Sequence, residues 1–260
     1  MRGAFLAVLL CLGVISGARA STVIDLRAQV AQALPSVVGI MRFDPKSRVS
    51  TQLVGTGFVV VDGKHIITNA HVARLPSAQS QTKITYFAVI VAPGSAPQRL
   101  RLQLVDRDAR YDLALLKLPQ AADALPVLPL IATPDPMVPG APVFSIGFPI
   151  AGALGPFPAV SSGIISAVTP SISPQMRASQ LDAAMLKAPR FALYQLDMTA
   201  YPGQSGSPLL DASTGRVLGV VNATKLKSTK EKVLSDPSGI SYAVMAAELR
   251  TFLLRNGLKP

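Results

Sequence analysis

The residues Gly57-Phe58-Val59-Val60-Val61-Asp62-Gly63-Lys64-His65-Ile66-Ile67-Thr68 form two short apolar runs on either side of an Asp-Gly pair. Asp-Gly between apolar runs is a strong sequence signal for a β-hairpin, because glycine readily adopts the positive φ angles of a tight turn. This stretch therefore predicts two antiparallel strands, 57–61 and 65–68, joined by a turn at Asp62 and Gly63.

Short apolar runs separated by turn residues continue along the chain, whose 22 prolines and 19 glycines mark the breaks. Six further strands are predicted, at 113–118, 143–146, 163–168, 191–196, 217–222 and 240–244. Helical spacing of apolar residues occurs only near the two ends, at 23–34 and 245–254. Short strands with helices at the edges predict an all-β sandwich or barrel architecture. The Pro-rich stretch 119–142 would join two halves, with a boundary near residue 125.

Residues 1–20 have the features of an export signal. Arg2 supplies a basic start, an apolar run fills 4–15, and Ala18 and Ala20 are the small residues that signal peptidase requires. The apolar run is shorter than the roughly 20 residues that span a bilayer, which argues against the alternative of an uncleaved anchor. We therefore expect cleavage after Ala20 and an exported protein, either periplasmic or secreted.

Removal of this signal leaves 240 residues, enough for one large β-rich domain or two small barrels. It also removes Cys11, the only cysteine, so the mature chain has no intramolecular disulfide. With no cysteine and only two histidines, a metal site of the Cys/His type is excluded, and no metal ion is expected.

The mature chain keeps 23 of the 25 basic residues against 14 acidic ones, a net charge of +9. Such a charge raises the question of nucleic-acid binding. However, the basic residues are scattered, and the densest cluster, Lys225, Lys227, Lys230 and Lys232, has few aromatic residues nearby for base stacking. We interpret the cluster as a solvated loop and expect no nucleic-acid partner; contact with anionic membrane surfaces would be peripheral at most.

The segment Tyr201-Pro202-Gly203-Gln204-Ser205-Gly206-Ser207-Pro208-Leu209-Leu210 predicts a tight glycine turn that presents a serine hydroxyl beside exposed backbone amides. A serine nucleophile needs two N–H groups directed at the negative charge that develops on the substrate oxygen. Taken alone, such a turn is more often a plain connection. The hypothesis of a nucleophile at Ser205 therefore depends on finding its partners.

The imidazole base must be His65 or His71, the only two histidines of the chain. Both precede the serine, which excludes the order of an α/β-hydrolase, where the histidine follows it. His65 opens a strand directly after the Asp-Gly turn and is expected to face solvent. His71 follows the apolar run 66–70 and can project into a cleft, so His71 is the favoured base; its alternative role is that of a core histidine.

The carboxylate that orients the imidazole should stand at the edge of a buried strand. Asp112 immediately precedes the apolar run 113–118, which is too short for a helix and is followed by proline. Asp106 and Asp108 are competitors in a more polar loop. Asp112 is therefore the favoured partner of His71, with a strand-end cap as its alternative role.

These three segments resemble the boxes of the trypsin-like serine proteases, and within them those of the HtrA/Deg group of envelope proteases. The order His, Asp, Ser matches that family. Thr68-Asn69-Ala70-His71 resembles its Thr-Asn-x-His box, 112–117 its Asp-Leu-Ala-x-x-Lys box, and 203–208 its Gly-Asn-Ser-Gly-Gly/Ser-Pro box. Supporting stretches also match, at 34–38, 55–58, 162–166 and 239–244, so the resemblance runs from about residue 33 to about residue 254.

The chain departs from the family in three respects. Gln204 replaces the usual Asn or Asp before the nucleophile, which leaves the detailed geometry of the turn open. No Ile-Val-Gly-Gly-like activation peptide follows the signal. The stretch after residue 254 is too short for the PDZ domain that HtrA proteins usually carry, so we expect an HtrA-like protein without one.

The resemblance implies an all-β fold of two six-stranded antiparallel barrels with short terminal helices, the first in 21–125 and the second in 126–260. His71, Asp112 and Ser205 would form the catalytic triad, with His71 and Asp112 on the first barrel. The amides of Gly203 and Ser205 would bind the oxyanion. No cofactor is implied, the partners would be polypeptide substrates, and nothing indicates the oligomeric state.

The resemblance also implies where the side chain before the scissile bond would bind. The floor of that pocket lies six residues before the nucleophile, at Thr199 beside Ala200, and Val221, Asn222 and Ala223 would form the opposite wall. Two other functions remain open from the sequence. One is a non-catalytic polypeptide-binding module or chaperone on the protease fold, and the other is an acyl hydrolase that uses the same triad.

Overall fold

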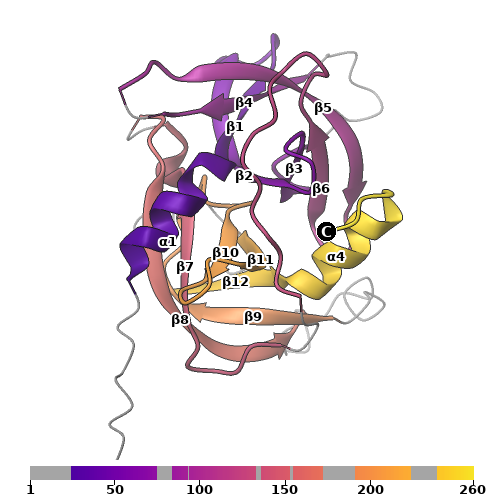
Figure 1. Ribbon diagram of the computed structural model, residues 1–260. Coiled ribbons are helices and arrows are strands. Elements are labelled where there is room, and N and C mark those ends of the chain that lie inside the picture. Colours follow the sequence, from indigo (N-terminus) through magenta and orange to yellow (C-terminus); the bar gives the residue numbers. More distant parts are fainter. Residues whose placement is uncertain are drawn as a thin grey trace, which may run out of the picture.

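The computed structural model describes residues 25–74, 84–92, 94–132, 136–152, 155–171, 191–223 and 239–260. Within them, strands form two closed six-stranded barrels in which neighbouring strands run antiparallel (Figure 1). The expected fold of two six-stranded barrels is confirmed. The predicted export signal and the Lys225–Lys232 cluster lie outside the described residues.

The strand order of the first barrel is β1-β2-β3-β6-β5-β4 and that of the second is β10-β11-β12-β9-β8-β7. The first barrel comprises β1 (Val37–Phe43), β2 (Thr51–Val60), β3 (His65–Asn69), β4 (Thr85–Ile90), β5 (Gln98–Asp108) and β6 (Leu113–Lys117). The second comprises β7 (Pro142–Gly147), β8 (Ala159–Pro170), β9 (Ala192–Asp197), β10 (Pro208–Asp211), β11 (Val217–Asn222) and β12 (Ile240–Met245).

Among the described residues, two α-helices flank the barrels, close to the ranges that the sequence predicts. They are α1 (Leu26–Ala33), which continues into the short 3-10 helix η1 (Leu34–Ser36), and α4 (Ala246–Arg255). A second 3-10 turn, η2 (Pro149–Gly152), follows β7. The Asp25 side chain caps the first helix by accepting a hydrogen bond from the N–H of Arg27 at 3.1 Å.

The quoted hairpin is present as β2 and β3, with Phe58 opposite Ile67 and Val60 opposite His65. The loop between them spans four residues, longer than an Asp-Gly pair alone, and has positive φ at Val61 and Gly63. Four further strands, β1, β4, β5 and β10, were not predicted from the sequence. The prediction of a hairpin at this position is confirmed, and its loop is wider than expected.

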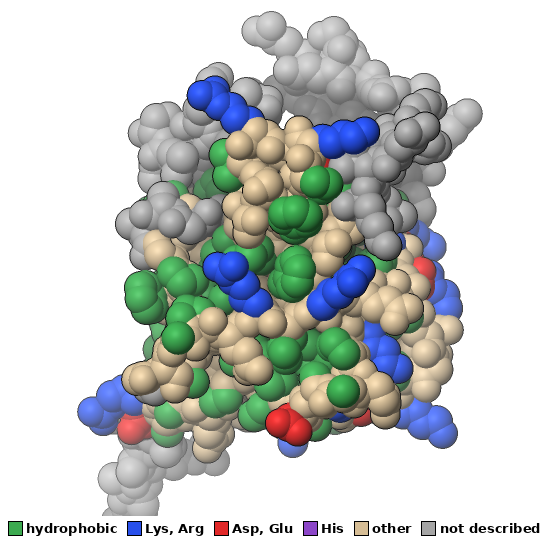
Figure 2. Space-filling model, turned by 90° about the horizontal axis from the view of Figure 1, so that it is seen from above, with side chains coloured by type: hydrophobic (Ala, Val, Ile, Leu, Met, Phe, Trp, Pro, Cys, Tyr) green, Lys and Arg blue, Asp and Glu red, His purple; other side chains and the backbone are tan. Residues whose placement is uncertain are grey.

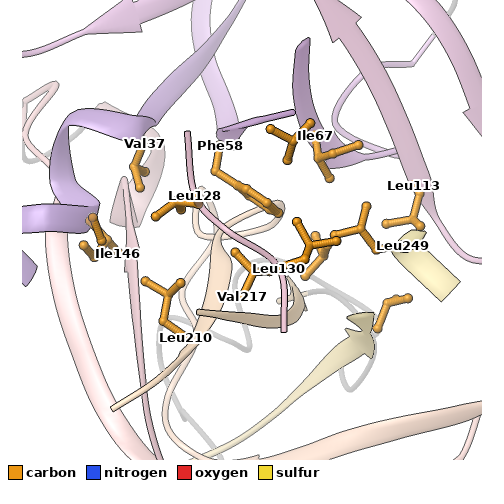
Figure 3. Packing of buried hydrophobic residues seen from close by; sticks show 14 of the residues in the cluster. Val37, Phe58, Ile67, Leu113, Leu128, Leu130, Ile146, Leu210, Val217 and Leu249 are labelled. Atoms are coloured by element: carbon orange, nitrogen blue, oxygen red, sulfur yellow. The ribbon is translucent and has the colours of Figure 1, made fainter. Parts of the chain in front are cut away.

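The largest group of buried apolar side chains lies between the barrels and draws on both of them (Figure 3). Phe58, Ile67 and Leu113 come from the first barrel, whereas Ile146 and Val217 come from the second. Each barrel also has one cluster of buried apolar side chains in its own interior. Strands at the contact are therefore buried on both faces, which explains why β6 reads as a continuous apolar run instead of an alternating one.

The segment that connects the barrels is itself bonded to both. The N–H of Leu128 donates to Val59 of the first barrel at 3.1 Å. Farther along, Pro129 accepts from the N–H of Val217 at 2.8 Å, and the N–H of Ile131 donates to the Val217 carbonyl at 3.0 Å. The expected boundary near residue 125 falls in this segment, between β6 and β7.

Polar and aromatic contacts also cross from the second half of the chain to the end of β5 and to the turn that follows it, before Asp112. Arg255, at the end of α4, donates to the carboxylates of Asp106 at 2.8 Å and Asp108 at 2.7 Å. The Tyr111 ring meets Phe191 edge to face, with ring centroids 5.0 Å apart. The end of β5 and the turn after it are therefore held by residues from outside the first barrel.

The face shown in Figure 2 carries apolar side chains at its centre. The Lys and Arg side chains in the middle of this face are separated by apolar ones and do not form a continuous basic strip.

The buried Asp211 carboxylate makes the free energy of unfolding depend on pH. It is 7% exposed and accepts hydrogen bonds from the N–H and hydroxyl groups of Ser213 and Thr214. Burial alone would raise its pKa, but these bonds outweigh burial and hold the pKa of Asp211 below its usual value. The ionised group therefore stabilises the fold above about pH 4, and this contribution is lost as pH falls from there through the lower folded-state pKa.

We expect Asp211→Asn to lower the free energy of unfolding at pH 7 by about 1–2 kcal/mol, because the amide is a weaker acceptor than the carboxylate. The difference from the parent should shrink below about pH 4. Urea denaturation at several pH values measures both effects, with the exposed Asp123→Asn as the matched control. A difference that persists unchanged at low pH would contradict the assignment.

Candidate active site

His71 and Asp112 lie at the same end of two neighbouring strands of the first barrel. β3 ends at Asn69, two residues before His71, and β6 begins at Leu113, directly after Asp112. Because Asn69 pairs with Leu113 across the sheet, the two predicted residues meet there. Nδ1 of His71 is 2.7 Å from Oδ2 of Asp112, and the backbone N–H of His71 donates to Oδ1 at 2.9 Å. The carboxylate thus holds both the ring and the backbone of His71.

The backbone of Asp112 is in the left-handed region, with a φ of +56°. Its carbonyl accepts hydrogen bonds from the N–H of Ala70 and from the side-chain amide of Asn69, both at 3.0 Å. Outside glycine, aspartate and asparagine are among the residues that adopt this conformation most readily. The residue type therefore suits the backbone at this position as well as the contact with His71.

Asn222, at the end of β11, reaches the same carboxylate from the second barrel. Its side-chain amide donates to Oδ2 of Asp112 at 2.8 Å. The sequence predicts Asn222 only as part of the wall of a substrate pocket, so this contact was missed. Oδ2 thus faces His71 Nδ1 and the Asn222 amide together, which restricts the rotation of the carboxylate.

Ser205 lies in the turn between β9 and β10 and is 3% exposed. Its hydroxyl oxygen accepts a hydrogen bond from the N–H of Ala223 at 3.3 Å. Asn222, the residue before Ala223, contacts Asp112. The consecutive residues Asn222 and Ala223 therefore link the Ser205 turn to His71 and Asp112. In the described part of the chain, the His71 ring makes no hydrogen bond to the Ser205 hydroxyl.

The turn that carries Ser205 leaves two backbone amides available. The N–H of Gln204 donates to Tyr201, and the N–H groups of Gly206 and Ser207 also donate to backbone carbonyls. By contrast, the N–H groups of Gly203 and Ser205 donate to no group within the described residues. These are the two amides that the sequence predicts for an oxyanion site.

The conformation of Gly203 has a local cause. Gly203 has a φ of +100° and follows Pro202, which is the residue pattern of a type II turn over 201–204. Only glycine adopts this φ without steric cost, because any Cβ would be strained there. The Pro-Gly pair therefore sets the direction of the peptide that carries the Gly203 amide.

The Gln204 side chain reinforces the same turn. It is 3% exposed, its Oε1 accepts from the N–H of Tyr201 at 2.7 Å, and its Nε2 donates to the Ser161 hydroxyl of β8 at 3.2 Å. The Gln204 side chain therefore adds a second hydrogen bond across the turn, beside that of its backbone N–H, and it bonds the turn to β8. The sequence left the effect of Gln204 open and did not single out Ser161.

The residues predicted for a substrate pocket fall into two groups. Thr199 is half-buried and Ala200 is buried, in the segment after β9. That segment is anchored by the Ser241 hydroxyl, which donates to the Met198 carbonyl at 2.7 Å. On the other side, Val221 exchanges backbone hydrogen bonds with Gly206 and Ser207, which brings 221–223 beside the serine turn, although the Val221 side chain packs in the interior of the second barrel.

His65 differs from its prediction. It is only 7% exposed, and its Nδ1 lies 2.9 Å from both oxygens of Asp62. The expectation that it faces solvent is wrong, because the wide hairpin loop folds Asp62 back onto the ring. This pair lies at the opposite end of β3 from His71.

Gln204 gives a prediction that can be checked without any substrate. We expect Gln204→Leu to lower the free energy of unfolding by about 1–2 kcal/mol, because the part-buried N–H of Tyr201 would lose its acceptor. Urea denaturation measures this loss, and Gln103→Leu at an exposed position of β5 serves as the control. A Gln204→Leu protein as stable as the Gln103→Leu protein would show that the side chain does not hold the turn.

The described residues show neither a metal-binding cluster nor a membrane-spanning helix. No group of three or more His, Cys, Asp or Glu side chains in the described ranges is placed to hold a metal ion. In the same ranges no helix has the length and apolar character needed to cross a membrane.

Comparison with known proteins places these features in a family. The model of the trypsin-like peptidase domain matches residues 55–220, which include His71, Asp112 and Ser205. The chain is 30% identical over 229 residues to the human serine protease HTRA4 and 32% identical over 193 residues to the putative serine protease HhoB of Synechocystis. These alignments cover 87% and 74% of this chain, but 40% and 38% of the relatives.

A probable periplasmic serine endoprotease of the DegP-like type from Halomonas elongata is 30% identical over 167 residues, covering 64% of this chain and 28% of that protein. The chain thus spans less than half the length of these three curated relatives.

Solved structures agree with the fold. The active form of the protease Rv3671c from M. tuberculosis superposes with a TM-score of 0.62 at 26% identity, covering 89% of this chain and 85% of that one. Deg5 superposes with a TM-score of 0.63 at 23% identity, covering 89% and 94%, a likeness of fold alone. The chain therefore belongs to the trypsin-like peptidase family, and within it is similar to the HtrA and Deg serine proteases.

Proposed function

We propose that the protein is a serine endopeptidase that cleaves peptide bonds with Ser205, His71 and Asp112. The observation that carries this proposal is the meeting of a histidine held by a carboxylate with a serine turn that keeps two amides free. A non-catalytic scaffold has no need of this combination. The similarity to serine proteases supports the same reaction class.

In the proposed reaction, Ser205 Oγ attacks the carbonyl carbon of the peptide bond while His71 Nε2 takes its proton. The tetrahedral intermediate carries its negative charge on the former carbonyl oxygen, where the Gly203 and Ser205 amides donate to it. His71 then gives the proton to the leaving amine, which departs and leaves an acyl group on Ser205. Water, deprotonated by His71, attacks this ester to form a second tetrahedral intermediate. The intermediate collapses by breaking the bond to Ser205 Oγ, which receives the proton from His71, and the acid is released.

Asp112 keeps the His71 ring in the tautomer with its proton on Nδ1, so that Nε2 is free to accept. It also stabilises the imidazolium that forms during each proton transfer. The Asn222 amide keeps the carboxylate directed at the ring. The contact between the serine and its base tightens in such enzymes when the substrate binds, which fits the present position of the Ser205 hydroxyl at the Ala223 amide.

The proposed substrates are polypeptides of the cell envelope or exterior, unfolded ones in particular. The expected export signal and the likeness to a probable periplasmic endoprotease support this location. No cofactor or metal takes part in the proposed reaction.

For the residue before the scissile bond, we propose a preference for small or aliphatic side chains. Thr199, at the floor of the proposed pocket, has no negative charge, and neither does Ala200 or Ala223. Burial of a Lys or Arg side chain there without a partner would cost several kcal/mol, whereas each buried methylene contributes about 0.8 kcal/mol. Asp197 is the nearby acid, and it is exposed.

The triad prediction is tested by Ser205→Ala, His71→Ala and Asp112→Asn. Each should lower the turnover of unfolded casein by about four to six orders of magnitude, and combinations should cost no more than single changes, because the three residues act as one unit. Labelling by a fluorophosphonate probe should disappear in Ser205→Ala.

His65→Gln is the matched control, since His65 also pairs with an aspartate but lies at the far end of β3. It should keep the parental turnover. Casein degradation by Ser205→Ala at the parent rate would remove Ser205 from the mechanism. Turnover of esters without any cleavage of peptides would favour an acyl hydrolase, and binding of casein without either reaction would favour a chaperone.

The specificity prediction is tested with a peptide library. Cleavage should follow small or aliphatic residues, and Thr199→Asp should shift the preference toward Lys and Arg, because it places a carboxylate at the floor of the pocket. A parental profile dominated by Lys or Arg would contradict the neutral pocket and point to Asp197, which Asp197→Asn would then verify.

A further inference from the structure

The buried residue Thr56 of β2 contacts the serine turn at two points. It is fully buried, and its hydroxyl donates to the Gly203 carbonyl at 2.7 Å. Its backbone N–H donates to the Ser205 carbonyl at 2.9 Å. A residue of the first barrel therefore bonds the carbonyls on both sides of the Ser205 amide, although Thr56 and Gly203 have a sequence separation of 147.

Thr56 is also bonded to the strand that leads to His71 and to the second barrel. Its carbonyl accepts from the Thr68 hydroxyl at 2.6 Å, three residues before His71. Its Oγ1 accepts from the N–H of Phe148 at 3.0 Å. The hydroxyl is thus used both as donor and as acceptor. Thr56 connects β3, which leads to His71, with the turn that carries Ser205 and with the segment after β7.

The approach of the turn to Thr56 is close. A Cβ atom on Gly206 would lie 2.1 Å from the Thr56 carbonyl oxygen and 2.3 Å from the Thr68 hydroxyl, so only glycine fits there. The Gly203 carbonyl has no other partner among the described residues, and loss of the Thr56 hydroxyl would leave it and the Phe148 amide without one.

We propose that Thr56 is a positioning residue for the oxyanion site, which its hydroxyl aligns with His71 across the two barrels. The inference rests on the proposed function, because alignment matters only if Ser205 reacts. A trans peptide points its C=O and N–H in opposite directions, so bonds that hold the carbonyls of 203 and 205 also fix the peptides that flank the Ser205 amide. Displacement of reacting groups by about 1 Å can lower a rate by about 100-fold.

The test compares Thr56→Val, which has nearly the same shape without the hydroxyl, with Thr56→Ser, which keeps it. We expect Thr56→Val to lower kcat about 10- to 100-fold with KM changed less than about 3-fold, and fluorophosphonate labelling to slow in parallel. Thr56→Ser should retain kcat within about 3-fold of the parent. Kinetics are measured at a temperature at which thermal unfolding shows each variant to be folded.

Thr214→Val is the control, since it removes a threonine hydroxyl bonded to Asp211 in the remote turn after β10. It should destabilise the protein without a change in kcat. A folded Thr56→Val protein with the kcat of the parent overturns the inference, and so does a Thr56→Ser protein that loses as much activity as Thr56→Val. If Thr56→Val does not fold, Thr56→Ala removes the same hydroxyl without added bulk and is judged in the same way.

Measurements on the parent protein distinguish failure of the proposed function from failure of the role proposed for Thr56. A parent that neither cleaves casein nor labels at Ser205 overturns the proposed function and this inference with it. An active parent with an equally active hydroxyl-free variant overturns the inference alone.

Discussion

The apolar contact between the two barrels is the constraint on which the site depends. His71 and Asp112 belong to one barrel and Ser205 to the other, so neither barrel contains the site by itself. The packed side chains around Phe58 hold the barrels in one relative position, and close packing permits little sliding. The connecting segment adds backbone bonds to each side. Two polar contacts cross between the barrels at the site: the Asn222 amide donates to Asp112, and the Thr56 hydroxyl donates to Gly203.

Much of the fold could be predicted because strands buried on both faces are apolar along nearly their whole length, as β6 and β11 are before their last residues, Lys117 and Asn222. The strands that escaped prediction have different compositions. β10 has only four residues, and it directly follows the glycine and serine residues of a turn, so its short apolar run does not stand out. In β5, Arg99 and Arg101 alternate with Leu100 and Leu102, a period-2 pattern that was available but lies in a polar context. The pairing of strands into two barrels came from the family resemblance, because no single strand determines its neighbours.

In the candidate site, His71, Asp112 and Ser205 could be identified from the sequence, because each lies in a short sequence motif. Their mutual geometry could not be predicted from those motifs. The contacts that shape the site join residues far apart in the chain, as Asn222 and Asp112 are, at a sequence separation of 110. The orientation of Gln204 and the burial of His65 likewise depend on which segments pack beside them. Sequence patterns identify chemistry that is local, whereas tertiary packing decides which side chain meets which.

The left-handed backbone of Asp112 limits how this family member can change during evolution. Most side chains at a φ of +56° carry a strain of about 1–3 kcal/mol, whereas asparagine and glycine enter this conformation easily. A relative that keeps the fold but lacks this carboxylate is therefore expected to carry Asn or Gly at the position of Asp112. The residue found there in related sequences would then separate those that retain a charged partner for the histidine from those that have lost it.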